Sequence, residues 1–306
     1  MYFLNENEKL YLHKSLIPES REMYIDYELR GWNWHKAPLE PVYDIKLGVA
    51  DVANSYCPTD RDLYVRKVFN EYFKANKKMV EGSILHKTIE KFVTNTKKVL
   101  YNQSVDSLND SSIFNINKNI VNDIISSNRN SNICDKDKLK EKIKRVWNFE
   151  KKRVEYRIQE VLAAQPYIGI DALLYQVIPV VVEQKLDGSF LGLSPYLSTD
   201  AINFSEPMIV DTKFGKKRDF HKLSVTGYAL VMESLYSFPV NIGCITYPTI
   251  KKDRILIDRE LFIISDELRQ KFIEKRDDKM RMIYEEIDPG ISDDCYKICP
   301  FYDFCH

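Results

Sequence analysis

The spacing of apolar residues divides the chain into a helical first half and a second half of alternating strands and helices. In the first half apolar side chains recur every three or four positions, so we expect helices over residues 58–73, 79–100 and 137–164. After Pro166 the apolar runs shorten to strand length, so we expect strands over residues 175–186, 191–204, 207–214, 240–247 and 255–264. Two further helical patterns, over 219–236 and 266–287, complete the order of an α/β protein with a helical front end.

Breaks in this pattern divide the chain into four parts. These are an N-terminal extension (1–56), a helical region (57–165), a strand-rich core (166–287) and a cysteine-rich C-terminal segment (288–306). Within the helical region, residues 101–133 contain nine Asn and seven Ser, a composition that buries little apolar surface. We therefore expect a polar, mobile insertion there, with one weak helix. The pair Asp187-Gly188 predicts a hairpin between the first two strands.

The overall charge and composition narrow the possible functions. The chain has 306 residues, of which 45 are basic and 45 acidic, so a nucleic-acid role would depend on local basic patches. Only 10 residues are glycine, and no glycine-rich phosphate-binding loop is present. No apolar run is long enough to cross a membrane and the first residues lack a signal-peptide pattern, so we expect a cytoplasmic protein.

Four of the six cysteines have a spacing typical of an inorganic centre. Cys295, Cys299 and Cys305 fall within eleven residues, and a four-ligand site needs one more thiolate. Cys57, just before a predicted helix, is the best candidate for that ligand. In a cytoplasmic chain this pattern favours metal chemistry over disulfides, and zinc is an alternative to an iron–sulfur centre. The other two cysteines are not expected to be ligands: Cys134 and Cys244.

A second group of residues could hold a divalent cation. Asp211 and Lys213 are two positions apart in a predicted strand, so their side chains point to the same face. Asp200 is expected at the end of the preceding strand. Two carboxylates on neighbouring strands, with a lysine beside them, can bind Mg²⁺ or Mn²⁺ and orient a water molecule. A surface ion pair at a strand end is the alternative interpretation.

Together these residues resemble a known nuclease pattern. The order is Cys57, Gly82-Ser-Ile-Leu-His86, Asp200, Asp211-Thr-Lys213 and the C-terminal cysteine trio. It is similar to that of the RecB-like nucleases of the PD-(D/E)xK superfamily that carry an iron–sulfur cluster. More narrowly it resembles the CRISPR-associated exonucleases, in particular the larger archaeal variant of subtype I-A systems. The resemblance implies a restriction-endonuclease-like core, a central mixed sheet flanked by helices, with a helical N-terminal part and a C-terminal iron–sulfur segment.

The resemblance also implies a role for each matching residue. A metal ion, Mg²⁺ or Mn²⁺, would be bound by His86, Asp200, Asp211 and the backbone carbonyl of Thr212. The catalytic group would consist of Asp200, Asp211, Lys213 and Tyr228, with Lys213 positioning the attacking water. A [4Fe–4S] cluster would be ligated by Cys57, Cys295, Cys299 and Cys305. The alternative for His86 is a half-buried side chain at the edge of the apolar stripe of its helix.

One position departs from the family pattern. The helix after the D-x-K strand usually carries Gln-x-x-x-Tyr, and the matching residues here are Ser224 and Tyr228. A serine side chain is too short to reach what a glutamine reaches. The departure bears on rate and substrate preference more than on metal binding.

The implied function is a metal-dependent DNA nuclease, an exonuclease that processes DNA ends before spacer integration in CRISPR adaptation. Its partners would be DNA with single strands or single-stranded ends and the integrase proteins of adaptation, with no membrane involved. The alternatives are a non-catalytic iron–sulfur DNA-binding or assembly subunit and a zinc-stabilised interaction protein. DNA would contact local basic groups, either at 211–218, with a net charge of +3, or along 135–153, with +5. For the second segment the alternative is a solvated helix face with pairs such as Glu141 to Arg145.

Overall fold

The structure is a computed structural model that describes residues 1–306 except 73–74, 104–107, 109–110, 252–253 and 298. Its helices are α1 (Glu6–Tyr11), α2 (Ile17–Glu22), α3 (Val49–Ala53), α4 (Arg61–Lys67), α5 (Lys77–Asn102), α6 (Lys118–Ser126), α7 (Lys136–Ala164), α8 (Ile170–Val177), α9 (His221–Tyr236), α10 (Asp266–Tyr284) and α11 (Tyr302–Cys305). Its strands are β1 (Val181–Leu186), β2 (Leu197–Asn203), β3 (Met208–Thr212), β4 (Ile242–Ile250) and β5 (Ile255–Ile263). None of the described helices has the length and apolar character that a membrane crossing needs. The first predicted helix, 58–73, is too long: α4 covers only Arg61–Lys67, and the backbone turns left-handed at Asn70, which ends the helical pattern. Residue 73 and parts of the polar insertion lie outside the described residues.

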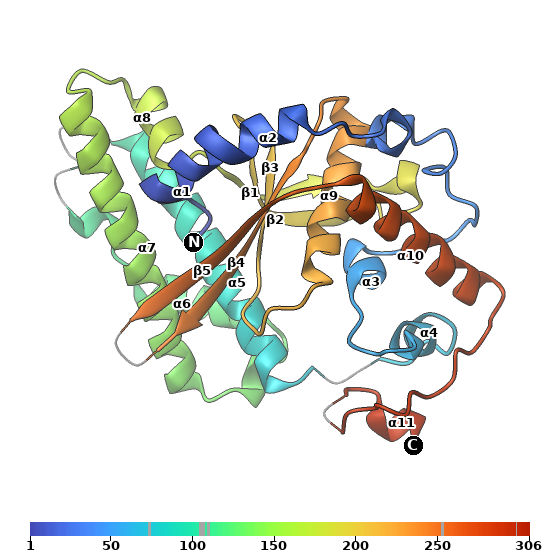
Figure 1. Ribbon diagram of the computed structural model, residues 1–306. Coiled ribbons are helices and arrows are strands. Elements are labelled where there is room, and N and C mark those ends of the chain that lie inside the picture. Colours follow the sequence, from blue (N-terminus) through green and yellow to red (C-terminus); the bar gives the residue numbers. More distant parts are fainter. Residues whose placement is uncertain (73–74, 104–107, 109–110, 252–253, 298) are drawn as a thin grey trace.

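The five strands form one mixed sheet in the order β1-β2-β3-β4-β5. β3 and β4 run parallel and are connected by α9, whereas the other neighbouring strands are antiparallel. Helices cover both faces of this sheet, with α5, α7 and α8 on one side and α3, α9 and α10 on the other (Figure 1). The predicted α/β class, a mixed sheet flanked by helices behind a helical N-terminal part, is confirmed.

Each helical layer buries its own apolar core against the sheet. In the first core the rings of Phe92 in α5 and Trp147 in α7 meet edge to face, with their centroids 5.1 Å apart. In the second core Val225 of α9 packs with Phe272 of α10. Because interiors are packed as densely as organic crystals, two such cores fix the sheet between them. Side chains that project from the strands therefore have well-defined positions.

The polar insertion contributes more to the core than its composition suggests. Phe114, Val121 and Ile124 are buried, and the indole N–H of Trp147 donates to the Phe114 carbonyl over 2.8 Å. α6 is the one helix that the sequence predicts there. The expectation that residues 101–133 bury little is wrong for their described part, because a few spaced apolar residues suffice where α5 and α7 already offer an apolar surface.

The first predicted strand is partly a helix. Residues 170–177 form α8, and the strand begins only at Val181, after Pro179. A short apolar run fits either period, so the sequence alone could not separate these two elements. β1 and β2 pair antiparallel as the Asp187-Gly188 signal predicts, but their connection is longer than a tight turn and contains a 3₁₀ turn at Ser189–Leu191.

A buried ion pair ties the N-terminal extension to α9 and α10. The carboxylate of Glu233 accepts two hydrogen bonds from the Arg269 guanidinium, at 2.8 and 2.9 Å, and one from Arg30 at 2.8 Å. Backbone N–H groups of Gly31 and Val240 donate to the same carboxylate. A Cβ atom at position 31 would lie 2.0 Å from the Leu230 carbonyl oxygen, so only glycine allows this close approach.

We expect Glu233→Ala to lower the free energy of unfolding by about 3–5 kcal/mol, because it leaves the Arg269 guanidinium buried and unpaired. Urea denaturation measures this change. The matched control is Glu141→Ala, which removes the exposed partner of Arg145 and should cost less than about 1 kcal/mol. Equal effects of the two substitutions would contradict the structural role of the buried pair.

Candidate active site

Three carboxylates lie in one row across three adjacent strands. In the pairing of β1 with β2, Val182 faces Ala201 and Gln184 faces Thr199, so Glu183 falls opposite Asp200. In the pairing of β2 with β3, Ala201 faces Val210, and the next position in that register puts Asp200 opposite Asp211. The register of the sheet therefore gathers these acidic residues from distant parts of the sequence.

Asp200 lies within β2 and not at its end, as the sequence analysis expected. Its carboxylate oxygen Oδ2 accepts the backbone N–H of Thr212 over 2.8 Å and lies 3.3 Å from Nδ1 of His86 on α5. Burial opposes ionisation of Asp200, but His86, this amide and Lys213 outweigh it and lower the pKa of the carboxyl. Burial likewise opposes a charged His86, and Asp200 outweighs it, so the pKa of this imidazole is raised.

Asp211 carries the least compensated charge of the site. The side chain is buried, and its Oδ2 lies 2.8 Å from Nζ of Lys213. Burial raises the pKa of Asp211 to about 6 and outweighs the attraction of Lys213; repulsion by Asp200 adds to the rise. For Lys213, burial lowers the pKa but Asp211 raises it further, so the ammonium stays charged. The sequence prediction that Asp211 and Lys213 share one face is confirmed.

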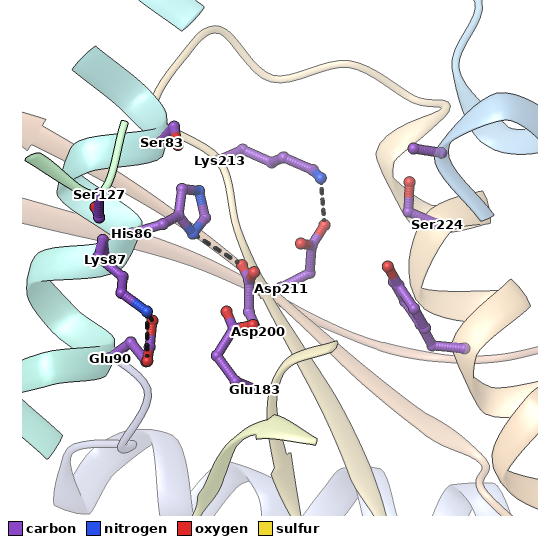
Figure 2. A pocket seen from close by; sticks show the side chains of 12 residues that line it. Ser83, His86, Lys87, Glu90, Ser127, Glu183, Asp200, Asp211, Lys213 and Ser224 are labelled. Carbon is purple, nitrogen blue, oxygen red and sulfur yellow. Dashed lines mark hydrogen bonds and ion pairs between the residues drawn. The ribbon is translucent and has the colours of Figure 1, made fainter. Parts of the chain in front are cut away.

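The two acidic residues open into a cavity of about 480 Å³ (Figure 2). Figure 2 shows His86 and Lys213 approaching the two aspartates, with Ser224 of α9 on the facing wall. Tyr228, one turn further along α9, lines the same cavity, and burial together with the negative charge of Asp211 and Asp200 raises its pKa, so its hydroxyl keeps its proton. The hydroxyl of Ser224 is buried and has no hydrogen-bond partner among the described residues.

Glu183 is a residue of this cavity that the sequence analysis missed. Its backbone is left-handed, with φ at +52°, which is unusual for a non-glycine residue in a strand. The Ser198 hydroxyl donates to its Oε2 over 2.8 Å, and the side chain lines the cavity beside Asp200. The available signal was a carboxylate directly after the apolar run Val180 to Val182, a poor place for a charge in a structural strand.

The donor chemistry of the site suits a hard divalent cation. Carboxylate oxygens of Asp200 and Asp211 and the imidazole of His86 converge, and burial together with repulsion by Asp200 raises the pKa of Asp211. Thr212, whose carbonyl is the fourth expected ligand, follows Asp211 directly and is the last residue of β3. Across the described part of the chain, however, no three His, Cys, Asp or Glu side chains are arranged so that they could hold a metal ion. Binding therefore requires rearrangement of side chains, beginning with Lys213.

The four predicted cluster ligands lie in the loop before α4 and in the C-terminal segment. All four cysteines are partly exposed free thiols. Burial raises the pKa of Cys295, and the charges of Cys305 and Cys57 add to it; burial also raises that of Cys299, with further contributions from Cys295 and Cys57. Thiolates are the soft ligands that an iron–sulfur cluster or zinc requires. Among the described residues, however, no three of these thiols are arranged so that they could hold a metal ion, so binding of either centre requires the segment to rearrange.

Direct contacts hold the C-terminal segment against the residues around α4. Arg61 forms a bidentate pair with Asp288, both bonds at 2.8 Å, and donates from Nη1 to the Cys305 sulfur at 3.1 Å. The hydroxyl of Thr59 donates to the Gly290 carbonyl over 2.9 Å. These contacts fix Cys305 relative to the loop that carries Cys57.

The two remaining cysteines belong to the apolar core. Cys244 lies in β4, is fully buried, and has a pKa that burial raises to about 11, which disfavours a thiolate ligand. Cys134 is buried beside the first turn of α5, where its sulfur approaches the Lys77 carbonyl.

The basic segments are largely neutralised. Six of the nine basic side chains over residues 135–153 take part in ion pairs, and Arg145 pairs with Glu141 as in the solvated-face interpretation. In the other segment, Lys213 pairs with Asp211 and Lys217 with Asp258. Neither segment is therefore a free basic surface over its whole length.

The mixed sheet between two helical layers, with an acidic row and a lysine at its centre, defines a PD-(D/E)xK-like core. The family described as CRISPR-associated exonuclease Csa1 matches residues 1–306, and the chain belongs to this family. A protein of Saccharolobus solfataricus named CRISPR-associated exonuclease Csa1 is 30% identical over 307 residues, covering 99% of both chains. A protein of the same name from Thermoproteus tenax is 26% identical over 278 residues, covering 91% of this chain and 90% of its own.

The raised pKa of Asp211 predicts that its ionised carboxylate lowers the stability of the metal-free protein, by an amount that depends on pH. With a pKa of about 6 in the folded chain, above the usual value of about 4, the folded state binds the proton more tightly than the unfolded state does. Stability is therefore lost as the pH rises from 4 to 7, by about 1–3 kcal/mol. Asp211→Asn should remove this loss. In EDTA the stability of the variant relative to wild type should therefore increase as the pH rises from 4 to 7.

Urea denaturation at several pH values measures this difference. Asp258→Asn, at an exposed ion pair with Lys217, is the matched control and should keep a constant difference from wild type. If the stability difference between Asp211→Asn and wild type also stayed constant with pH, burial would not raise the pKa of the Asp211 carboxyl, and the prediction would be contradicted.

Proposed function

We propose that this protein is a metal-dependent DNA exonuclease that trims DNA ends before spacer integration in CRISPR adaptation. The observation that carries the proposal is the convergence of His86, Asp200, Asp211 and Lys213 in one cavity. The family to which the chain belongs is named for an exonuclease, which supports the reaction class.

Each residue of the cavity has a distinct part in this proposal. Asp200 and Asp211, with His86 and the Thr212 carbonyl, would hold Mg²⁺ or Mn²⁺. When bound, the cation supplies a Lewis acid that offsets the charge accumulating on the phosphate oxygens. The Thr212 N–H keeps the Asp200 carboxylate oriented through the 2.8 Å hydrogen bond, so that this ligand is positioned before substrate arrives.

Lys213 and Tyr228 act on the substrate and the water. The Lys213 ammonium lies 2.8 Å from Asp211, and with that carboxylate serving as a metal ligand it would turn toward the attacking water and the phosphate. Water would attack phosphorus in line with the 3′ oxygen. The bond between phosphorus and this oxygen would break, which leaves a 5′-phosphate and a 3′-hydroxyl. Tyr228, which keeps its proton, can donate a hydrogen bond to a phosphate oxygen from the opposite wall.

The second part of the proposal is a [4Fe–4S] cluster held by Cys57, Cys295, Cys299 and Cys305. Such a centre would connect the loop before α4 to the C-terminal segment and close a loop of most of the chain. Arg61 would support it by holding Cys305 through its hydrogen bond to the sulfur. The integrase proteins of adaptation are the proposed partners, because trimmed ends are their substrate.

Ser224 favours a second candidate, a non-catalytic iron–sulfur subunit that binds DNA or organises the adaptation complex. Its buried hydroxyl has no hydrogen-bond partner among the described residues, so the site lacks a side chain as long as the family's glutamine that could hydrogen-bond further into the cavity. Zinc in place of the cluster would make the protein a zinc-stabilised interaction module.

We expect DNA cleavage to require Mg²⁺ or Mn²⁺ and to stop in EDTA. Asp200→Ala removes a metal ligand, and Lys213→Ala removes the charge that orients water, so each should lower the cleavage rate about a hundredfold or more. Rates on 5′- and 3′-labelled single strands measure both effects. Glu206→Ala, whose carboxylate pairs with His13 outside the cavity, is the control that should keep the wild-type rate.

Wild-type protein that cleaves neither single- nor double-stranded DNA with either metal would replace this proposal by the non-catalytic one. In that case Ser224→Gln, which restores the family pattern, should restore cleavage if the departure is the cause.

We expect anaerobically purified protein to contain about four iron and four sulfide ions per chain. Cys299→Ser should lose iron and stability together, because a cluster that forms only in the folded chain contributes to folding. The double variant Cys134→Ser/Cys244→Ala is the control and should keep its iron content. Colourless protein with one equivalent of zinc would contradict the cluster.

A further inference from the structure

A second cavity lies along the same helix and strand as the active-site cavity. It measures about 380 Å³ and is lined by Thr94, Lys97, Lys98 and Tyr101 of α5 and by Val181 and Val182 of β1. The active-site cavity is lined by Ser83, His86, Lys87 and Glu90 of α5 and by Glu183 of β1. Residues of α5 and β1 therefore line both cavities, and Thr94 lies one helical turn beyond Glu90.

The lining residues of α5 form a single stripe that begins at the catalytic carboxylates. Positions 83, 87, 90, 94, 97 and 101 recur every three or four residues, which is the spacing of one helix face. From His86 to Lys97 the axis advances about 16 Å at 1.5 Å per residue. This length corresponds to roughly two or three nucleotides of an extended strand.

The chemistry of the stripe changes from acidic to basic along this path. Lys97 and Lys98 face the second cavity, and no carboxylate is among its described lining residues. The Lys97 ammonium donates to the Val180 carbonyl over 2.6 Å, which fixes it beside β1. Lys98 is exposed and Tyr101 is 59% exposed, so a positive charge and an aromatic ring at the second cavity are accessible to a ligand.

These features suit a nucleic acid strand better than an added β-strand of a protein partner. β1 is an edge strand, but the left-handed backbone of Glu183 interrupts its extended conformation, and Lys97 already bonds to the carbonyl of Val180, just before the strand. Phosphate contacts by lysine and stacking on an exposed aromatic ring are the usual means of holding a single strand.

We propose that one DNA strand runs from the active-site cavity through this groove between α5 and β1. Lys97 and Lys98 contact backbone phosphates two to three nucleotides from the scissile bond, and Tyr101 stacks on a base. A groove bounded by one helix and one strand admits a single strand, so the groove selects single-stranded ends. The inference rests on the proposed nuclease function and adds the path of the substrate.

The test is the length dependence of DNA binding, measured by fluorescence anisotropy in EDTA, where no cleavage occurs. Labelled oligothymidylates of three and eight nucleotides are compared for wild type and for Lys98→Ala/Tyr101→Ala. Wild type should bind the longer strand more tightly, and the double variant should lose about tenfold or more of that gain. Its affinity should also depend less steeply on salt, because one phosphate contact is lost.

The matched control is Lys152→Ala/Tyr156→Ala, an exposed lysine and tyrosine on α7 that line neither cavity. Circular dichroism verifies that both double variants are folded. Equal affinities of the Lys98→Ala/Tyr101→Ala variant and this control for the longer strand, or binding of duplex alone, would overturn the groove even if the protein cleaves DNA. Wild type that shows the expected length dependence but cleaves no DNA would keep the groove and overturn the nuclease function.

Discussion

The site depends on holding two like charges, Asp200 and Asp211, side by side in a buried place. The register of β2 and β3 brings them together, and burial makes their repulsion costly. The backbone N–H of Thr212, the imidazole of His86 and the ammonium of Lys213 offset that cost only in part. The proposed cation would relieve the remaining repulsion, so the cost in stability at this point of the sheet is what the proposed chemistry requires.

The rest of the fold supplies these compensating groups from separate layers. His86 comes from α5 in the helical half, while Tyr228 and Ser224 come from α9, the crossover between β3 and β4. The buried pair of Glu233 and Arg269 anchors α9 to α10 and to the N-terminal extension. The helical front end therefore contributes to the candidate active site, because without α5 the Asp200 carboxylate would lose its imidazole partner.

The order of elements could be predicted from periodicity because the long helices and most strands have a clear period. α8 could not be separated from β1, since a short apolar run fits both periods. Asp211 and Lys213 lie side by side as their spacing predicts. The four cysteines are indicated by their spacing, and the role of His86 is implied by the resemblance. Glu183 escaped because its placement depends on strand register and on a left-handed backbone, which are properties of the pairing and not of the residue. The burial of Phe114 likewise depends on tertiary contacts with α7.

The most direct test of the account is calorimetric titration of Mn²⁺ into metal-free protein. The adjacent carboxylates of Asp200 and Asp211, the second of them buried, should bind the ion at one site in wild type, and Asp211→Asn should weaken that binding by at least about tenfold. Lys213→Ala should bind at least as tightly as wild type, because the ammonium that competes with the ion for Asp211 is gone. Unchanged affinity in Asp211→Asn would contradict the claim that this carboxylate pair is the metal site.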